Sequence, residues 1–224
     1  MIETKNLTKT FKDGEAETKV LKGVDFKAED GEFVAIMGRS GAGKSTLLYL
    51  MSLLDEPTDG EVIIDGNDTR KMTTDEKTLF RLEKCGYVFQ DYALLPDLTA
   101  IENVVLPLLM QNINKKKAYL QAKDALAKVK LGHRLHNLPS HLSGGEQQRV
   151  SIARAVAHNP KILFADEPTA NLDNESSATV IEIFKELHKE GQTIIMVTHE
   201  EQYAKMAGKI IQLDDGKIVS VLES

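Results

Sequence analysis

The chain has 224 residues, of which 42% are hydrophobic and 28% charged, and its formal net charge is −6. This length and composition are those of a globular protein that buries a core, as one large domain or two small lobes. The acidic balance argues against a surface that coats nucleic acid or adsorbs to lipid, because both targets are commonly anionic.

The first 65 residues show the alternation typical of strands. Residues 33–37 form a continuous apolar run, which is typical of a strand buried on both faces of a parallel sheet. Asp30-Gly31 marks a turn before this run. The strands predicted in this part of the chain comprise residues 2–7, 19–28, 32–37 and 61–65.

The middle of the chain favours helices. Residues 44–54 are apolar enough for a core helix, and residues 70–141 show helical periodicity with little strand signal. We therefore expect a helical lobe inserted into a sheet-based core. Small and apolar side chains at helical spacing predict one buried face, formed by Ala118, Ala122, Ala125, Leu126 and Val129. Two threonine–glutamate pairs have the spacing of a capping box, namely Thr73 with Glu76 and Thr99 with Glu102.

Alternation of strands and helices resumes after residue 141. A helix is predicted at residues 175–190, and Asp215-Gly216 marks the turn of a closing hairpin. The strands predicted in this part comprise residues 162–165, 193–197, 210–213 and 217–221.

No segment of the sequence predicts secretion or a membrane span. Residues 1–5 lack the apolar core of a signal peptide. The longest apolar stretches, residues 47–54 and 104–110, are far shorter than the roughly 20 residues that a spanning helix requires. Cys85 is the only cysteine, which excludes an intrachain disulfide and fits a reducing compartment. We therefore expect a cytoplasmic chain that reaches a membrane through a partner.

A phosphate-binding loop follows the apolar run at residues 33–37. The complete G-x-x-x-x-G-K-S pattern is present, as Gly38-Arg39-Ser40-Gly41-Ala42-Gly43-Lys44-Ser45. Glycines let backbone amides point at a phosphate, and the helix that follows offers its positive N-terminal end. We expect Lys44 to contact the β and γ phosphates, Ser45 to bind magnesium and Thr46 to donate one more hydrogen bond. The order strand, loop, helix predicts nucleoside triphosphate binding rather than an ordinary glycine-rich turn.

An acidic pair follows the apolar strand predicted at residues 162–165. Asp166 is expected at the edge of the sheet, where its carboxylate can hold magnesium directly or through water. Glu167 is then placed to polarise an attacking water. Alone, an Asp-Glu pair is usually a solvated turn, but the preceding strand and the following Pro168 favour a catalytic interpretation.

A second helix start carries two adjacent glycines. Ser143 is a good N-cap residue, and Gly144 and Gly145 leave backbone amides accessible to an anion. A structural cap explains Ser143, but each glycine weakens a helix start by about 1 kcal/mol. The two glycines therefore favour a ligand at this terminus. Asn159-Pro160 is expected to end the helix.

Together these motifs resemble the ABC-type ATPases over essentially the whole chain. Residues 142–147 resemble the signature motif, and Gln90 matches the Q-loop. Residues 171–173 match the D-loop, and His199 matches the switch histidine. Phe11 stands where the family places an aromatic residue that stacks on adenine, although tyrosine is commoner there. Within the family, the chain is similar to the ATPases of macrolide-efflux and lipoprotein-releasing systems, on Phe89-Gln90, residues 98–104 and the short C-terminus.

The resemblance implies an α/β fold with a P-loop NTPase core, a mainly parallel sheet, an N-terminal antiparallel β subdomain and an inserted α-helical subdomain. It implies a single ABC-type ATP-binding domain over residues 1–224, with residues 1–90 and 143–224 as the catalytic core and about 91–142 as the helical subdomain. It also implies a head-to-tail homodimer that encloses two ATP molecules. Each ATP then contacts Lys44 and Glu167 of one copy and Ser143 of the other.

The resemblance assigns residues to three roles. The catalytic residues that it implies are Lys44, Gln90, Glu167 and His199. The magnesium ligands that it implies are Ser45, Gln90 and Asp166. The ATP-binding residues that it implies are Phe11, Gly38, Arg39, Ser40, Gly41, Ala42, Gly43, Lys44, Ser45, Thr46, Gln90, Ser143, Gly144, Gly145, Glu146, Asp173 and His199.

The expected function is that of an ATP-hydrolysing subunit on the inner face of a cell membrane. A membrane permease is expected to dock near residues 90–105, although burial of residues 92–105 in the chain's own core is an alternative. Export, lipoprotein extraction and force transmission all fit this chain. The alternative from another class is an ABC-type switch acting on nucleic acid or ribosomes. Such proteins carry long coiled-coil insertions or tandem nucleotide domains, which this acidic sequence lacks, so no nucleic acid is expected. Asp173 has two interpretations, a helix cap and a contact across the dimer.

Overall fold

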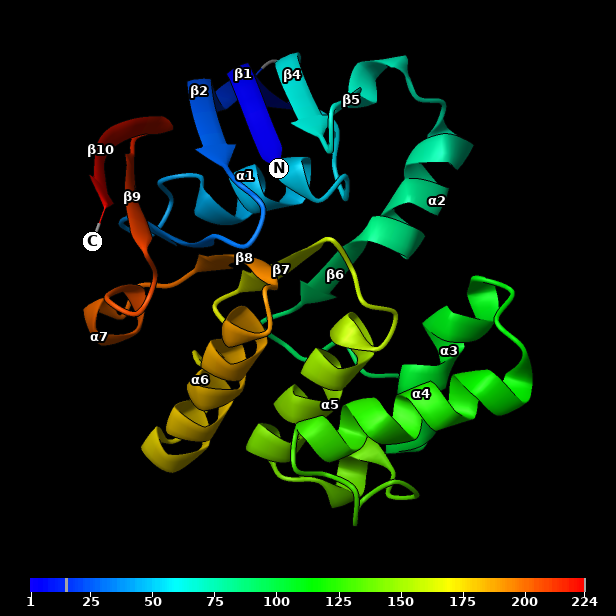
Figure 1. Cartoon of the computed structure of the whole chain (residues 1–224). Coiled ribbons are helices and arrows are strands. Elements are labelled where there is room, and N and C mark those ends of the chain that lie inside the picture. The colour runs from blue at the N-terminus through cyan, green and yellow to red at the C-terminus, as the bar shows by residue number, and fades with distance from the viewer. Residues whose placement is uncertain (15, 224) are drawn as a thin grey trace. The chain divides into compact units, whose positions relative to one another are not determined.

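A long antiparallel pair of strands, β1 (Ile2–Asp13) and β2 (Ala16–Ala28), begins the chain in the computed structural model, which describes residues 1–14 and 16–223 (Figure 1). The chain divides into two compact units, Met1–Arg81 with Gly191–Ser224, and Leu82–Glu190. The division does not test the subdomain bounds implied by the sequence, which remain a prediction.

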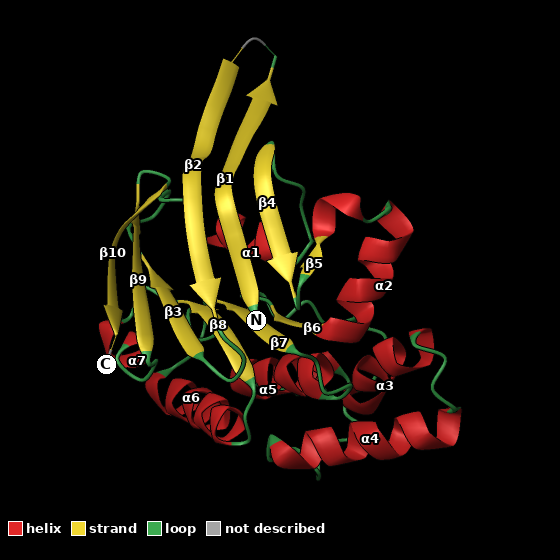
Figure 2. Ribbon diagram, turned by 45° about the horizontal axis from the view of Figure 1, so that its top comes forward, coloured by secondary structure: helices red, strands yellow, loops and turns green. Residues whose placement is uncertain are grey.

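The first unit contains the antiparallel sheet that the sequence predicts. Strand β4 (Asp59–Ile64) pairs with β1, and the short β5 (Asn67–Asp68) pairs with β4, which gives the order β2-β1-β4-β5 (Figure 2). Apolar side chains such as Leu7, Leu21 and Val62 are fully buried. Strands β1 and β2 extend well beyond the predicted bounds, because the polar residues near their turn pair across the hairpin.

A second sheet in the first unit is mainly parallel, as predicted. Strand β3 (Phe33–Met37) lies between β8 (Thr193–Val197) and β9 (Lys209–Asp214) and is parallel to both. Strand β10 (Lys217–Glu223) closes an antiparallel hairpin with β9. Two helices contact this sheet, α1 (Lys44–Met51) on β8 and the short α7 (Glu201–Ala204) on β3. The predicted apolar run in β3 is buried from Phe33 to Ile36.

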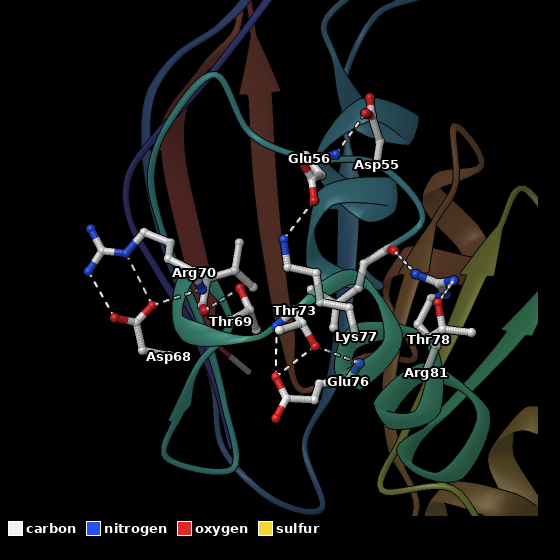
Figure 3. A network of polar contacts seen from close by, with 12 residues as sticks. Asp55, Glu56, Asp68, Thr69, Arg70, Thr73, Glu76, Lys77, Thr78 and Arg81 are labelled. Carbon is white, nitrogen blue, oxygen red and sulfur yellow. Dashed lines mark hydrogen bonds and ion pairs between the residues drawn. The ribbon is translucent and has the colours of Figure 1, made fainter.

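Helix α2 (Thr74–Lys84) has no buried side chain and is held by polar contacts (Figure 3). The predicted capping box at its start is present, because Glu76 accepts from the Thr73 amide and Thr73 accepts from the Glu76 amide. Lys77 Nζ contacts Glu56 Oε1 at 2.7 Å. Arg81 Nη1 donates to the Leu53 carbonyl at 2.6 Å. The turn after α1 therefore anchors α2 through charge and hydrogen bonds rather than through apolar packing.

The second unit contains a parallel strand pair and most of the helical lobe. Strand β6 (Cys85–Val88) pairs with β7 (Ile162–Asp166), although the sequence predicts helices with little strand signal over residues 70–141. Local periodicity misses β6 because its four residues include Gly86. A Cβ at this glycine would overlap the Ala155 carbonyl. The glycine therefore allows α5 (Gly144–Val156) to pack closely against β6.

Helices α3 (Ala100–Met110) and α4 (Lys115–Lys128) pack against each other and against α5, while α5 contacts β6 and α6 (Asn174–Lys189) (Figure 1). The capping box predicted at Thr99 is confirmed. The predicted apolar face of the lobe is also confirmed, because all of its members are buried: Ala118, Ala122, Ala125, Leu126 and Val129. Two short 3₁₀ turns complete the fold, at Thr69–Lys71 and Pro139–His141.

Among residues 1–14 and 16–223, no helix is both long enough and apolar enough to span a membrane.

The ion pair between Asp68 and Arg70 next to α2 predicts a pH-dependent contribution to stability. Hydrogen bonds from the Arg70 side chain hold the pKa of Asp68 at about 2, below its ordinary 3.8. Because the folded-state pKa is depressed, the stabilisation is present above about pH 4 and is lost as the pH falls towards 2. The stability difference between wild type and an Asp68→Asn variant should therefore shrink between pH 5 and pH 3 in urea unfolding. A difference that stays constant over this interval would contradict the assignment. Asp75→Asn, which replaces an exposed carboxylate in the first turn of α2, serves as control.

Candidate active site

The phosphate loop lies in the first unit between β3 and α1, in the predicted order. Gly43 caps α1 with φ 98°, and a Cβ there would lie 2.9 Å from the Leu21 side chain, so this position requires glycine. Around Gly41 a Cβ would meet nothing within 4 Å. Lys44 is 8% exposed, and its Nζ donates to the carbonyls of Gly38 at 3.0 Å and Arg39 at 3.1 Å. The loop therefore fixes an ammonium group beside its own backbone amides, which suits an anion.

His199 shares a sheet edge with the phosphate loop. Strands β3 and β8 are parallel neighbours, with Ile36 opposite Val197, so their carboxyl ends meet at one edge. The Thr198 amide donates to the Ile36 carbonyl at 3.2 Å, which ties the two strand ends together. The exposed His199 follows directly. The first unit therefore brings together the phosphate loop and the predicted switch histidine.

Phe11 also lies in the first unit, on the β1–β2 hairpin. Its ring is 46% exposed, and Lys9 Nζ lies 5.0 Å from the ring centroid. The Lys9 ammonium is held in turn by Asp55 and by the Glu56 carbonyl, each at 2.7 Å. An exposed aromatic ring with a cation over it is suited to stacking on a planar base.

The acidic pair and Gln90 share a sheet edge in the second unit. Strands β6 and β7 are parallel, with Val88 opposite Ala165, so the segments that follow them begin side by side. Asp166 ends β7 and is 4% exposed. Glu167 follows with φ 43°, a left-handed conformation that turns the chain sharply after the strand.

The residue types expected to hold magnesium fit this ion. Asp166 offers a carboxylate oxygen, Ser45 a hydroxyl and Gln90 an amide oxygen, all hard donors that Mg²⁺ accepts. Asp166 is nearly buried at its strand end, and a buried carboxylate needs a cation or hydrogen-bond donors to compensate its charge.

The predicted signature segment begins α5 with a capping box. Ser143 Oγ accepts from the Glu146 amide at 3.2 Å, and Glu146 accepts from the Ser143 amide at 2.9 Å. Arg134 Nε also contacts Glu146 at 3.0 Å. Partial burial raises the pKa of Glu146, but the Ser143 amide and Arg134 outweigh it, so the pKa lies below its usual value. The Ser143 hydroxyl can still donate its own hydrogen to an anion.

The two glycines of this segment have a structural explanation that the sequence argument missed. A Cβ at Gly144 would lie 2.9 Å from Tyr92 Oη. At Gly145 it would lie 2.5 Å from Ser176 Oγ and 2.7 Å from Ser176 Cβ. Packing against Tyr92 and the start of α6 therefore gives both glycines a structural reason, and a ligand at this terminus stays a prediction.

The D-loop segment is tied to Gln90 within the second unit. Asn171 Nδ2 donates to the Gln90 carbonyl at 3.1 Å. Asp173 caps α6 by accepting from the Ser176 amide at 2.8 Å, and this bond lowers the pKa of Asp173. The capping role of Asp173 is confirmed. A contact of Asp173 across a dimer stays a prediction.

The family of the chain is decided by comparison with known proteins. The sequence profile described as ABC transporter matches residues 21–170. The chain belongs to the ABC transporter family. It is 47% identical, over 98% of its length, to the macrolide export ATP-binding/permease protein of Aggregatibacter actinomycetemcomitans, of which it covers 34%. It is 46% identical to the lipoprotein-releasing system ATP-binding protein of Aquifex aeolicus, over 90% of both chains.

A solved ATP-binding cassette has the same fold. The structure, described as a dimeric post-hydrolysis state bound to ADP and Pi, is 42% identical, with a TM-score of 0.93 over 100% of this chain and 98% of that chain. These findings confirm the predicted fold class, the narrower resemblance and an ATP-hydrolysing cassette. They give no support to the nucleic-acid alternative.

Two residues of this cassette were not singled out from the sequence. Arg154 on α5 donates to the carbonyls of Tyr92, at 2.9 Å, and Ala93, whose φ values are 64° and 48°. Burial lowers the pKa of Arg154. An arginine within the mostly apolar residues 150–156 is a signal that could have found it, because a charge that is partly removed from water needs partners. Gln148 is the second, and nothing in the sequence distinguishes it from its neighbour Gln147.

The contact between Gly145 and Ser176 predicts the effect of adding one methyl group. In a Gly145→Ala variant the new Cβ should displace α6, and the unfolding free energy should fall by about 1–3 kcal/mol. A second substitution, Ser176→Gly, removes the opposing atoms and should restore part of the loss. Denaturant midpoints measure both effects. Gly132→Ala is the control, because a Cβ there would lie 3.9 Å from Ala127. Equal midpoints for the two alanine variants would contradict the packing argument.

Proposed function

We propose that this cassette is the ATP-hydrolysing subunit of a membrane complex in which two copies assemble head to tail around two ATP molecules. Closing of the dimer on ATP, and its release after hydrolysis, would drive a conformational change in a membrane partner. The observation that carries the proposal is the full-length match to a dimeric cassette bound to ADP and Pi. The names of the relatives, which are a macrolide exporter and a lipoprotein-releasing system, support export or lipoprotein extraction as the output.

In this proposal the phosphates are bound mainly by the loop that carries Lys44. The Lys44 ammonium, already oriented by the carbonyls of Gly38 and Arg39, contacts the β and γ phosphates, while loop amides donate to the same oxygens. Thr46 adds a further donor, and the Phe11 ring stacks on adenine. The support is that the Lys44 ammonium is held at the loop by two carbonyls and that a Cβ at Gly41 would face open space.

Hydrolysis then depends on residues at the two sheet edges. Ser45, Gln90 and Asp166 would hold Mg²⁺, which supplies neutralisation of phosphate charge when bound. Glu167 orients the attacking water and takes its proton. His199 contacts the γ phosphate. The left-handed turn at Glu167 supports this role, because backbone strain of this kind is common at functional sites.

The other side of each ATP would be closed by the partner copy. Ser143, Gly144, Gly145 and Glu146 of that copy present the start of α5 to the γ phosphate, and Asp173 contacts the opposite subunit. The capping geometry at Ser143 supports this arrangement, since it holds the hydroxyl at the positive end of a 13-residue helix.

We also propose that a membrane permease docks beside Gln90, which would place the cassette on the inner face of the membrane. Of the expected region, residues 100–105 are almost entirely buried in the second unit and serve its own core. The exposed part is the segment at residues 90–97, where Leu95 is 45% exposed. This narrows the proposed docking surface to the segment before α3.

Replacement of Glu167 tests the catalytic assignment. A Glu167→Gln variant should bind ATP but hydrolyse it about 10²–10⁴ times more slowly, because it loses the general base. ATP turnover and size-exclusion chromatography with ATP measure both effects, with dimer expected to accumulate. A Glu190→Gln variant is the matched control on the surface. Hydrolysis by the Glu167→Gln variant at the wild-type rate would refute the assignment.

The Glu167→Gln variant also tests whether the partner is a membrane protein. Purified by affinity from a detergent extract with ATP present, it should retain a protein with several membrane spans. Ribosomes or DNA in its place would overturn the membrane role and leave the ATPase role intact.

Mixing two defective copies tests the shared chambers. A Lys44→Ala copy and a Ser143→Arg copy should each be inactive alone, because every homodimer lacks one required group in both chambers. In a random mixture, half of the dimers are mixed and each has one intact chamber, so about a quarter of the wild-type rate should return. Circular dichroism verifies that both copies fold. Complete absence of activity in the mixture would exclude chambers built from two copies.

A further inference from the structure

One side chain in the second unit joins the segment of Gln90 to the segment of Glu167. Gln148 on α5 is fully buried. Its Nε2 donates to the Pro168 carbonyl at 2.9 Å and to the Phe89 carbonyl at 3.4 Å. Pro168 directly follows Glu167, and Phe89 directly precedes Gln90. A single amide group therefore holds the main chain next to both residues.

The chemistry of this contact selects an amide. Both partners are carbonyls, which only accept, so the NH₂ group of Gln148 must face them. Its Oε1 has no hydrogen-bond partner among residues 1–14 and 16–223. A methionine has similar length and no buried acceptor to satisfy, so packing alone gives no reason for a glutamine here. What the glutamine adds is a tie between two main-chain segments.

The segments that it holds are in conformations that need support. Glu167 has φ 43°, and Tyr92, two residues after Gln90, has φ 64°. Non-glycine residues in this region persist only where their surroundings hold them. Asn171 holds the next carbonyl, that of Gln90, so two consecutive carbonyls of this loop are gripped by amide side chains.

We propose that Gln148 is a positioning residue for ATP hydrolysis. By fixing the carbonyls of Phe89 and Pro168 relative to each other, it fixes the distance and orientation between the Gln90 and Glu167 side chains. It acts through these two residues and touches no substrate. The inference rests on the function proposed above for Gln90 and Glu167.

A Gln148→Met variant removes both hydrogen bonds and keeps the side-chain volume. Its kcat for ATP should fall at least tenfold, because small displacements of catalytic groups cost about 10²-fold in rate. Its KM for ATP should stay within about twofold and its Tm within a few degrees, since the phosphate loop is untouched and packing is preserved. Gln121→Met on α4 is the matched control, because Gln121 Oε1 is also buried and unpartnered among the described residues. The control should behave as wild type.

A Gln148→Glu variant separates positioning from packing. When protonated, the new carboxyl keeps one donor for the two carbonyls, whereas the carboxylate has none and repels them. Burial raises the pKa of such a carboxyl. The kcat of this variant should therefore fall as the pH rises, over a range where the wild-type kcat changes little. A residue that only fills space would not produce this profile.

Parallel measurement of Glu167→Gln distinguishes failure of this inference from failure of the proposed function. A wild-type kcat in Gln148→Met, or a parallel fall of kcat, Tm and ATP affinity, would overturn the positioning role. If Glu167→Gln stalls while Gln148→Met does not, only this inference fails. If Glu167→Gln itself retains the wild-type rate, the proposed function fails first.

Discussion

Parallel pairing of strands is the constraint on which the site depends, because it delivers distant parts of the sequence to a common edge. In the first unit β3 and β8 place the phosphate loop and His199 at one edge, although these segments are more than a hundred residues apart in the chain. In the second unit β6 and β7 do the same for Gln90 and Asp166. Since neighbouring strand ends cannot separate without breaking backbone hydrogen bonds, loops at these edges can hold strained conformations such as that of Glu167.

Glycine in this cassette serves close approach as well as ligand binding. Gly43 is required by the neighbouring Leu21 side chain and by its left-handed conformation, whereas Gly41 faces open space. Gly145 is required by Ser176. A glycine in such a motif can serve close packing or access for a ligand, and the sequence does not distinguish the two. This is why the signature glycines suggested a ligand, while the structure supplies a sufficient reason within one unit.

Sequence alone predicts those parts whose signal is local. The buried strand at residues 33–37, the capping box at Thr99 and the buried face containing Ala118 each depend on residues a few positions apart. Polar extensions of β1 and β2 escape prediction because their only reason is pairing with each other. Gln148 escapes it for a stronger reason, since its partners lie 59 and 20 residues away in the sequence.

Hydrogen bonds from side chains to main-chain carbonyls are hard to predict from sequence. Gln148, Asn171 and Arg154 all donate to carbonyl oxygens, which every residue type carries. The residues whose carbonyls accept these bonds can therefore change side chain without loss of the contact. Their identity in the sequence does not reveal that the contact exists. Only the donor residue is constrained, because its side chain must carry N–H groups and reach one or two fixed carbonyls. An amide or guanidinium among the buried apolar residues of a helix is thus the sign to seek. On α5 both occur, as the buried Gln148 and the half-buried Arg154, beside the segments that the proposed chemistry uses.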